Sequence, residues 1–214
     1  IYLLVYQKRC HSAYRLRYAN NCFTSLLFLN FDLMNIEIIS GSPRQQSLTV
    51  RAAYAVQKWF QKNTQHNVGI IDCREHQLPW VEKVFNSIDN TPDQWKPLFE
   101  RIFKADAFIF VTPEYNGSYS PSLKNMVDHF PKQLHKTLGV VTASNGGFGG
   151  MRAAQQLILL GAGLFTVVCP QLLVIPTIDK KIDENGDLID LAFEKSIHNF
   201  ASEYLWLAEK IASK

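Results

Sequence analysis

The stretch AFIFVTPEYNGSYSPSLKNMVD, residues 107–128, indicates the fold class of this chain most clearly. Its opening apolar run, 107–111, is too short for a helix and is rich in aromatic and β-branched residues, which is typical of a buried strand. Pro113 ends the run, because proline has no N–H for a sheet hydrogen bond. Ser120 and Pro121 then have the N-cap and first-turn signature of a helix. Strand, polar loop and helix in this order predict one unit of a parallel α/β sheet.

Apolar runs and helical periods alternate along the rest of the chain in the same way. We predict strands at residues 36–39, 68–71, 107–111, 138–141 and 167–175, the last placed at an edge or bulge by Pro170. We predict helices at residues 48–62, from 91 to about 103, 121–130, 151–160 and 188–212. Residues 74–90 have no period, so we expect a long irregular excursion of functional or mobile character. Five alternations predict a doubly wound, five-stranded parallel sheet in a three-layer α/β/α architecture.

Composition and charge describe an ordinary globular protein with one sizeable domain. The chain has 214 residues, of which 47% are hydrophobic and 19% charged, and a net charge of +3. Residues 1–33 hold four of the 22 basic side chains and one of the 19 acidic ones, so the remainder holds 18 of each. A neutral domain predicts no nucleic-acid partner. No apolar run is long enough for a membrane span, and four cysteines without a C-x-x-C pair indicate reduced thiols in a cytoplasmic protein.

Residues 1–33 show neither helical nor strand periodicity, and the chain begins with Ile1 while Met34 directly precedes the first strand. The segment is basic, aromatic and poor in acids, a composition that weakly resembles an organelle-targeting presequence. Translated upstream sequence or a mis-set start is the other interpretation. Under either interpretation we expect residues 1–33 to be an unstructured extension and residues 34–214 to form the domain.

The loop at residues 41–47 joins the first predicted strand to the first predicted helix. A helix N-terminus offers unpaired N–H groups and a partial positive charge to an anion. Ser42, Ser47 and Thr49 add hydroxyl groups, and Arg44 adds a fork of donors suited to phosphate. The pattern predicts a phosphate site, although a capped helix start with a surface arginine would have the same residues. No Gly-Lys-Ser/Thr follows, so the loop is no P-loop.

Two further loops follow the third and fourth predicted strands. The first carries a carboxylate, a phenol and an amide side by side, and the second is so rich in glycine that its amides can approach a planar ligand. Their candidate binding residues are Pro113, Glu114, Tyr115 and Asn116 in the first loop and Ser144, Gly146 and Gly147 in the second. Because carboxyl ends of parallel strands share one edge, the loops predict a crevice for a phosphate and a flat heterocycle. Ordinary surface turns are the alternative for both.

Other motifs of catalysis or metal binding fail on their spacing. The acidic stretch 183–187 is no EF-hand loop, because Lys181 and Ala192 stand at the first and twelfth ligand positions. The six histidines do not cluster with cysteines or carboxylates, and a Gly-x-Ser-x-Gly elbow is absent from the sequence. We therefore predict neither a metal site nor an acid–base dyad.

With these loops in view, residues 34 to the C-terminus resemble the NADPH-dependent FMN reductase family, which has a flavodoxin-like fold. The resemblance rests on the motifs GSxRxxS, TPEYNGS and LKNxxD, which begin at residues 41, 112 and 123. It implies that the first loop holds the FMN phosphate and that the other two flank the isoalloxazine ring. Thr49 stands where many members have asparagine.

The resemblance also implies the reaction. Hydride passes from NADPH or NADH to FMN, and electrons then pass to a quinone, an azo compound, a metal oxyanion or free flavin. Because FMN carries the chemistry, no catalytic side chain is expected. The family is typically dimeric or tetrameric, so we expect a homodimer or homotetramer, with the predicted helix 121–130 and residues 78–95 at the subunit boundary.

Two rival functions remain open from the sequence. A non-enzymatic electron carrier of flavodoxin type is expected to be acidic, whereas this domain is neutral and has an arginine in its phosphate loop. A phosphate-binding α/β hydrolase or regulator would never bind flavin. The colour of the purified protein separates the last from the other two, and oxidation of NAD(P)H with added quinone separates enzyme from carrier.

Overall fold

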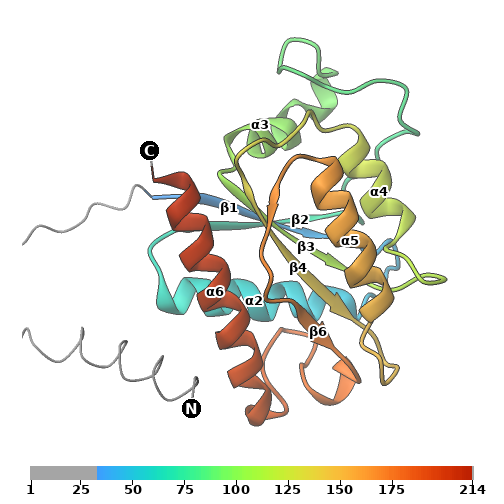
Figure 1. The fold of residues 1–214 in the computed structure, drawn as a ribbon. Coiled ribbons are helices and arrows are strands. Elements are labelled where there is room, and N and C mark those ends of the chain that lie inside the picture. The colour runs from blue at the N-terminus through green and yellow to red at the C-terminus, as the bar shows by residue number, and fades with distance from the viewer. Residues whose placement is uncertain (1–32, 214) are drawn as a thin grey trace, which may run out of the picture. The chain divides into compact units, whose positions relative to one another are not determined.

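The sheet is parallel and doubly wound in the computed structural model, which describes residues 33–213. Its strands are β1 (Asn35–Ser40), β2 (Asn67–Asp72), β3 (Ala107–Thr112), β4 (Thr137–Ala143), β5 (Val167–Val168) and β6 (Leu173–Ile175). The strand order is β2-β1-β3-β4-β5, with β6 also paired to β4, and every pairing is parallel (Figure 1). This flavodoxin-like order confirms the predicted fold class. The prediction of an unstructured extension falls on residues 1–32, outside the described residues, and on Leu33.

The fifth position of the sheet is split into two short strands. The prediction of one strand over residues 167–175 is wrong in this respect, since β5 pairs with Thr137 and Leu138 and β6 with residues 141–143 of β4. Pro170 lies between the two pieces, where it has no N–H to donate to the sheet. The predicted edge position and interruption are both confirmed.

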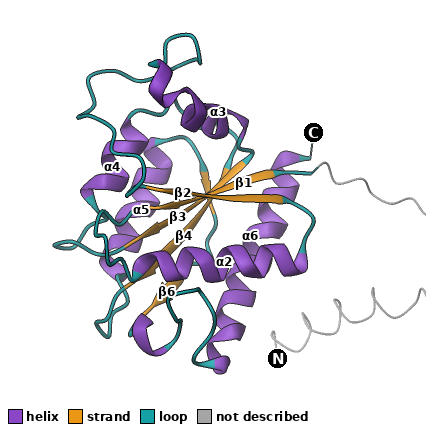
Figure 2. Cartoon of the chain, turned by 180° about the vertical axis from the view of Figure 1, so that it is seen from behind, coloured by secondary structure: helices purple, strands orange, loops and turns teal. Residues whose placement is uncertain are grey.

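Helices cover both faces of the sheet, as Figures 1 and 2 show. One face carries α2 (Thr49–Asn63) and α6 (Glu194–Ala212), and the other carries α3 (Lys96–Lys104), α4 (Pro121–Asp128) and α5 (Met151–Gly163). The side chains of β3 alternate between these two cores, which is why the whole strand is buried. Ala107, Ile109 and Val111 pack toward α2 and α6, whereas Phe108 and Phe110 pack toward the other layer.

Two helices begin later than their apolar patterns predict. The helix predicted from residue 91 is preceded by the 3₁₀ turn η1 (Asp93–Trp95) and begins at Lys96. The helix predicted from residue 188 begins at Glu194, because Leu188 pairs with Ile182 in an isolated bridge. Two more 3₁₀ turns, η2 (Ile178–Lys180) and η3 (Leu191–Phe193), lie in the connection between β6 and α6.

Residues 73–92 form no helix or strand, which confirms the predicted irregular excursion. Contacts near the middle of the excursion help to hold it to the domain. Phe85 is buried against Phe99, with ring centroids 4.9 Å apart, and Asn125 of α4 donates to the carbonyls of Leu78 and Pro79 at 3.1 and 3.0 Å. Within residues 33–213, no helix is long and apolar enough to cross a membrane.

Candidate functional site

The loops after β1 and β3 are joined at the carboxyl edge of the sheet. The N–H of Gly41 donates to the carbonyl of Val111 at 2.8 Å, and the hydroxyl of Ser120 donates to the carbonyl of Gly41. The same hydroxyl accepts the N–H of Leu123 and so caps α4. A Cβ atom at Gly41 would lie 2.7 Å from Cβ of Leu123, so only glycine lets α4 pack this closely on the loop. This junction lies at the switch point of the sheet, where open α/β folds bind ligands.

The loop after β1 has the form of an anion site. Ser42, Ser47 and Thr49 are buried, and the Ser47 hydroxyl accepts the N–H of Val50, in the first turn of α2, at 3.2 Å. Among the described residues, the N–H groups of 44–46 and 48–49 have no hydrogen-bond acceptor. Unpaired N–H groups at a helix N-terminus stabilise a bound anion.

Arg74, which was not among the predicted site residues, holds this loop in place from the end of the neighbouring strand β2. Its guanidinium pairs with Asp72 at the end of β2, with Nη2 2.6 Å from Oδ2, and its Nη1 donates to the carbonyl of Gln45 at 3.0 Å. The hydrogen bond to Asp72 raises the pKa of the Arg74 guanidinium. The sequence feature that could have indicated this ion pair is the Asp-x-Arg spacing directly after a predicted strand.

Arg44 and Tyr115 bring the first and second loops into contact. The guanidinium carbon of Arg44 lies 4.9 Å from the centroid of the Tyr115 ring, within cation–π distance. The Tyr115 hydroxyl is buried and has no hydrogen-bond partner among the described residues. A buried hydroxyl without a hydrogen-bond partner lowers the stability of the folded protein. It therefore marks a position where a ligand atom could supply the missing hydrogen bond.

Asn116 has a backbone role that explains its place in the sequence. Tyr115 and Ser118 exchange two backbone hydrogen bonds of 2.8 and 3.1 Å around Asn116 and Gly117. The φ angles of these central residues are 52° and 82°, as a type I′ turn requires and as Asn-Gly favours. The Asn116 side chain is exposed at the tip of this turn.

Glu114 joins the second loop to the third. Its carboxylate accepts the backbone N–H of Arg152 at 3.2 Å and lies 3.4 Å from the Arg152 guanidinium. Because Arg152 is in the first turn of α5, the carboxylate also lies at the positive end of that helix. Pro113 is half-buried, and its carbonyl accepts from the Thr112 hydroxyl.

The third loop, residues 144–150, exposes residues 145–148 to solvent. Ser144 is fixed at its base, where its N–H donates to Ile175 and its hydroxyl to the carbonyl of Gly146. Gly146 and Gly147 are exposed, and the N–H groups of 145–148 have no acceptor among the described residues. Consecutive free amides form a surface that binds negative charge on a ligand.

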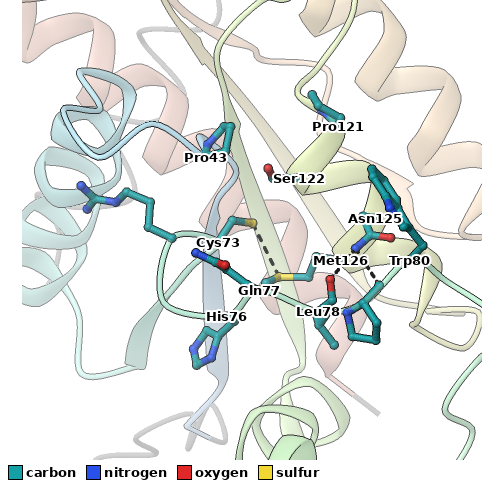
Figure 3. A pocket seen from close by; sticks show the side chains of 12 residues that line it. Pro43, Cys73, His76, Gln77, Leu78, Trp80, Pro121, Ser122, Asn125 and Met126 are labelled. Atoms are coloured by element: carbon teal, nitrogen blue, oxygen red, sulfur yellow. Dashed lines mark hydrogen bonds between the residues drawn. The ribbon is translucent and has the colours of Figure 1, made fainter.

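A cavity of about 350 Å³ lies beside these loops, between the excursion after β2 and the start of α4. Figure 3 shows Pro43 and Pro121 at one end of it and the Trp80 ring near Asn125. Cys73 and Met126 meet in its wall, with their sulfur atoms 3.8 Å apart. Burial and the nearby Asp72 raise the pKa of the Cys73 thiol to about 12, so this thiol is protonated and is not a nucleophile at neutral pH.

The three loops suit a ligand that has both a phosphate group and a flat polar ring. The unpaired amides before and at the start of α2, with the Arg44 guanidinium, fit a phosphate. The free amides of 145–148 and the Tyr115 hydroxyl fit the polar edge of a ring. FMN has both parts. Within the described part of the chain, no group of three or more His, Cys, Asp or Glu side chains could hold a metal ion.

Comparisons with known proteins agree with this geometry. The family model described as NADPH-dependent FMN reductase matches residues 34–179. An NAD(P)H-dependent FMN reductase of Schizosaccharomyces pombe is 31% identical over 168 residues, which cover 76% of this chain and 82% of the relative. An FMN-dependent NADPH-azoreductase of Staphylococcus aureus is 30% identical, over 70% of this chain and 80% of its own length.

Among solved structures, a flavoenzyme NAD(P)H:(acceptor) oxidoreductase of Paracoccus denitrificans superposes with a TM-score of 0.63 at 21% identity. The match covers 83% of this chain and 98% of that structure, and it shows the shared fold. With the family match over most of the domain, these findings identify the chain as a member of the NADPH-dependent FMN reductase family and as an FMN-dependent oxidoreductase.

Proposed function

We propose that this oxidoreductase holds FMN in the crevice between the loops after β1, β3 and β4. Its phosphate would lie at the N-terminus of α2, against Ser42, Arg44, Ser47 and Thr49. Its ring would lie between two sets of residues from the other loops, namely Pro113, Glu114, Tyr115 and Asn116 on one side and Ser144, Gly146 and Gly147 on the other. The observation that carries the proposal is the contact of Arg44, beside the unpaired amides of α2, with the Tyr115 ring.

Bound FMN supplies the redox chemistry, accepting hydride from NADPH or NADH and passing electrons onward. The protein's part is binding and electrostatics. Arg44 balances the charge of the phosphate, and the free N–H groups of 145–148 stabilise negative charge on the ring, in the manner of an oxyanion site. No side chain is needed as a general acid or base, so we assign no catalytic residue.

We propose a small, diffusible acceptor, of the quinone, azo, metal-oxyanion or free-flavin class. The Staphylococcus aureus relative is named as an azoreductase and the Schizosaccharomyces pombe relative as an FMN reductase. The cavity beside Pro43, with the exposed Trp80 at its margin, offers an aromatic surface next to the flavin crevice. A site that small molecules can enter freely favours an enzyme over an electron carrier, which would bind one partner protein.

We also propose that the protein forms a homodimer or homotetramer beside the site. Residues 153–178 contain no charged side chain, and the outer face of α5 exposes Met151, Ile158 and Leu159, with Phe148 just before the helix. An apolar face of this kind is typical of a subunit interface. It lies next to α4, which the sequence analysis placed at the boundary (Figure 1).

Leu159→Glu tests this interface, because it places a charge on the apolar face at an exposed position. We expect the protein to shift to a smaller species in size-exclusion chromatography with light scattering. Gln156→Glu is the matched control, since Gln156 is exposed on the same helix but off the apolar stripe. An unchanged oligomer in both variants would remove α5 from the interface.

We propose a cytoplasmic location, in keeping with the free, buried thiols of Cys73 and Cys169. No nucleic-acid partner is proposed, because the domain carries as many acidic as basic side chains.

The decisive experiment is FMN titration of the apoprotein. Arg44→Ala should weaken binding by about 1.5–3 kcal/mol, the range for a hydrogen bond to a charged group. Arg44→Lys should recover only part of this loss, because a lysine lacks the fork of donors. Lys210→Ala, an exposed change on α6, is the control. An unchanged FMN dissociation constant in Arg44→Ala would refute the assignment, and FMN-loaded protein that does not oxidise NAD(P)H when a quinone is added would favour the electron carrier.

A further inference from the structure

A second and larger cavity lies on the opposite helical layer, between α2 and the chain from Gly186 to His198. Its volume is about 690 Å³, roughly twice that of the cavity beside Pro43. Figure 2 shows α2 and α6 together on this side of the sheet. Trp59 in its wall is ten residues beyond the start of α2, or about 15 Å along the helix from the phosphate loop. The cavity is therefore separate from the flavin crevice.

The wall of this cavity is apolar and aromatic. Ala55 and Ile197 are buried in it, and Leu188 is half-buried. The half-buried Trp59 ring is held by an edge contact with Phe60, at 5.2 Å between centroids, and lies 5.6 Å from the His198 ring. A fixed indole beside a second ring favours a flat aromatic ligand over a flexible chain.

The rim of the cavity carries an excess of positive charge. Lys58, Lys62 and Lys195 line it together with Asp187 and Glu194, which leaves a net charge of +1. Lys58 is paired with Asp187 at 2.6 Å. Within residues 33–213, neither Lys62 nor Lys195 has a carboxylate oxygen within 4.0 Å, so both ammonium groups remain for a ligand.

We propose that this cavity is a second ligand site, which binds a planar aromatic molecule with a single negative charge, such as an aromatic carboxylate or sulfonate. The aromatic part packs on Trp59, and the anionic group lies at the rim between Lys62 and Lys195. The volume is in the usual range of small-molecule sites, about 300–1,000 Å³. Glu194 on the same rim disfavours a second negative charge on the ligand.

The test is a titration of ¹⁵N-labelled, FMN-loaded protein with 2-naphthoate, followed through the indole N–H signals of the four tryptophans. Trp59→Phe identifies the Trp59 signal by its loss. We expect a saturable shift of the Trp59 signal while the flavin absorbance spectrum is unchanged. Neutral 2-naphthamide should bind at least about five-fold more weakly, because it lacks the charge that the lysines attract.

Charge reversal then separates a site from general adsorption. The double variant Lys62→Glu/Lys195→Glu should weaken 2-naphthoate binding at least about five-fold, and Lys210→Glu, exposed on α6 away from the cavity, should not. Both variants change surface residues, so each should melt as the wild type does. The proposal is overturned if the Trp59 signal does not move, if only other tryptophans respond, or if the double variant binds 2-naphthoate as well as the control.

Discussion

The loops after β1 and β4 both lead from a strand into a helix, but they are built differently. The loop after β1 is fastened on two sides, by Ser120 to the carbonyl of Gly41 and by Arg74 to the carbonyl of Gln45. The loop after β4 is held through the carbonyl of Gly146, which accepts the N–H of Thr177 at 3.4 Å, but the amides of 145–148 have no acceptor among the described residues and the Phe148 side chain faces solvent. A tetrahedral, doubly charged phosphate needs donors at fixed positions, whereas a flat ring needs an open surface.

This difference also shows in the glycines. Gly41 has no room for a side chain, because a Cβ atom would lie 2.7 Å from Leu123. Gly147 has no heavy atom within 4 Å of a Cβ atom, so the fold does not require glycine there. At Gly41 glycine serves packing, whereas at Gly147 we infer that it serves the ligand.

The largest effect is expected from Arg74→Ala, which removes the fastening of the first loop. Asp72 is buried, so losing its partner should lower the free energy of unfolding by about 3 kcal/mol. Denaturant unfolding of the apoprotein measures this loss of stability. FMN affinity should fall as well, because the Gln45 carbonyl loses its hydrogen bond from Arg74. The double variant Asp72→Asn/Arg74→Gln should lose less stability, since it leaves no unpaired charge. A loss below about 1 kcal/mol in Arg74→Ala would mean that the pair does not fasten the loop.

Gly41→Ala and Gly147→Ala compare the two loops directly. Gly41→Ala should cost about 1–3 kcal/mol of unfolding free energy, because Leu123 must move. Gly147→Ala should change that free energy by no more than about 0.5 kcal/mol and yet weaken FMN binding. Thermal melting of the apoproteins and FMN titration separate these outcomes. Equal melting of the two variants would contradict the difference drawn between the loops.

Tyr115→Phe tests whether the partnerless hydroxyl meets the ligand. If it donates to FMN, affinity should fall by about 0.5–1.5 kcal/mol, the usual range for one hydrogen bond. The apoprotein should be as stable as wild type or slightly more so, because a buried unpaired group is removed. Wild-type FMN affinity in this variant would place the hydroxyl outside the binding site.

The smallest effect is expected from deletion of residues 1–33. The segment has no apolar period, and the residue that follows it, Met34, is buried directly before β1. Flavin content, melting temperature and NAD(P)H oxidation should equal those of the full chain. Precipitation or loss of flavin in the truncated protein would show that the segment belongs to the domain.

Local pattern alone predicted the elements of the fold. Buried strands of a parallel sheet are short apolar runs, and Ser120-Pro121 is a start signal that the capping bond to Leu123 confirms. The split of the fifth position into β5 and β6 was only partly visible, because Pro170 marks an interruption without fixing the pairing on each side. Helix starts were less accurate, since the bridge from Leu188 to Ile182 depends on a neighbouring segment.

The sequence by itself determined the parallel sheet, the three loops at its carboxyl edge and the residue types that suit a phosphate and a ring. Only the tertiary structure decided which of these residues meet. Glu114 and Arg152 are 38 positions apart, and Gln45 and Arg74 are 29 apart, with no periodic signal to join them. Periodicity reflects the burial of one face of one element, whereas a hydrogen bond between loops depends on how several elements dock, to within a few tenths of an ångström.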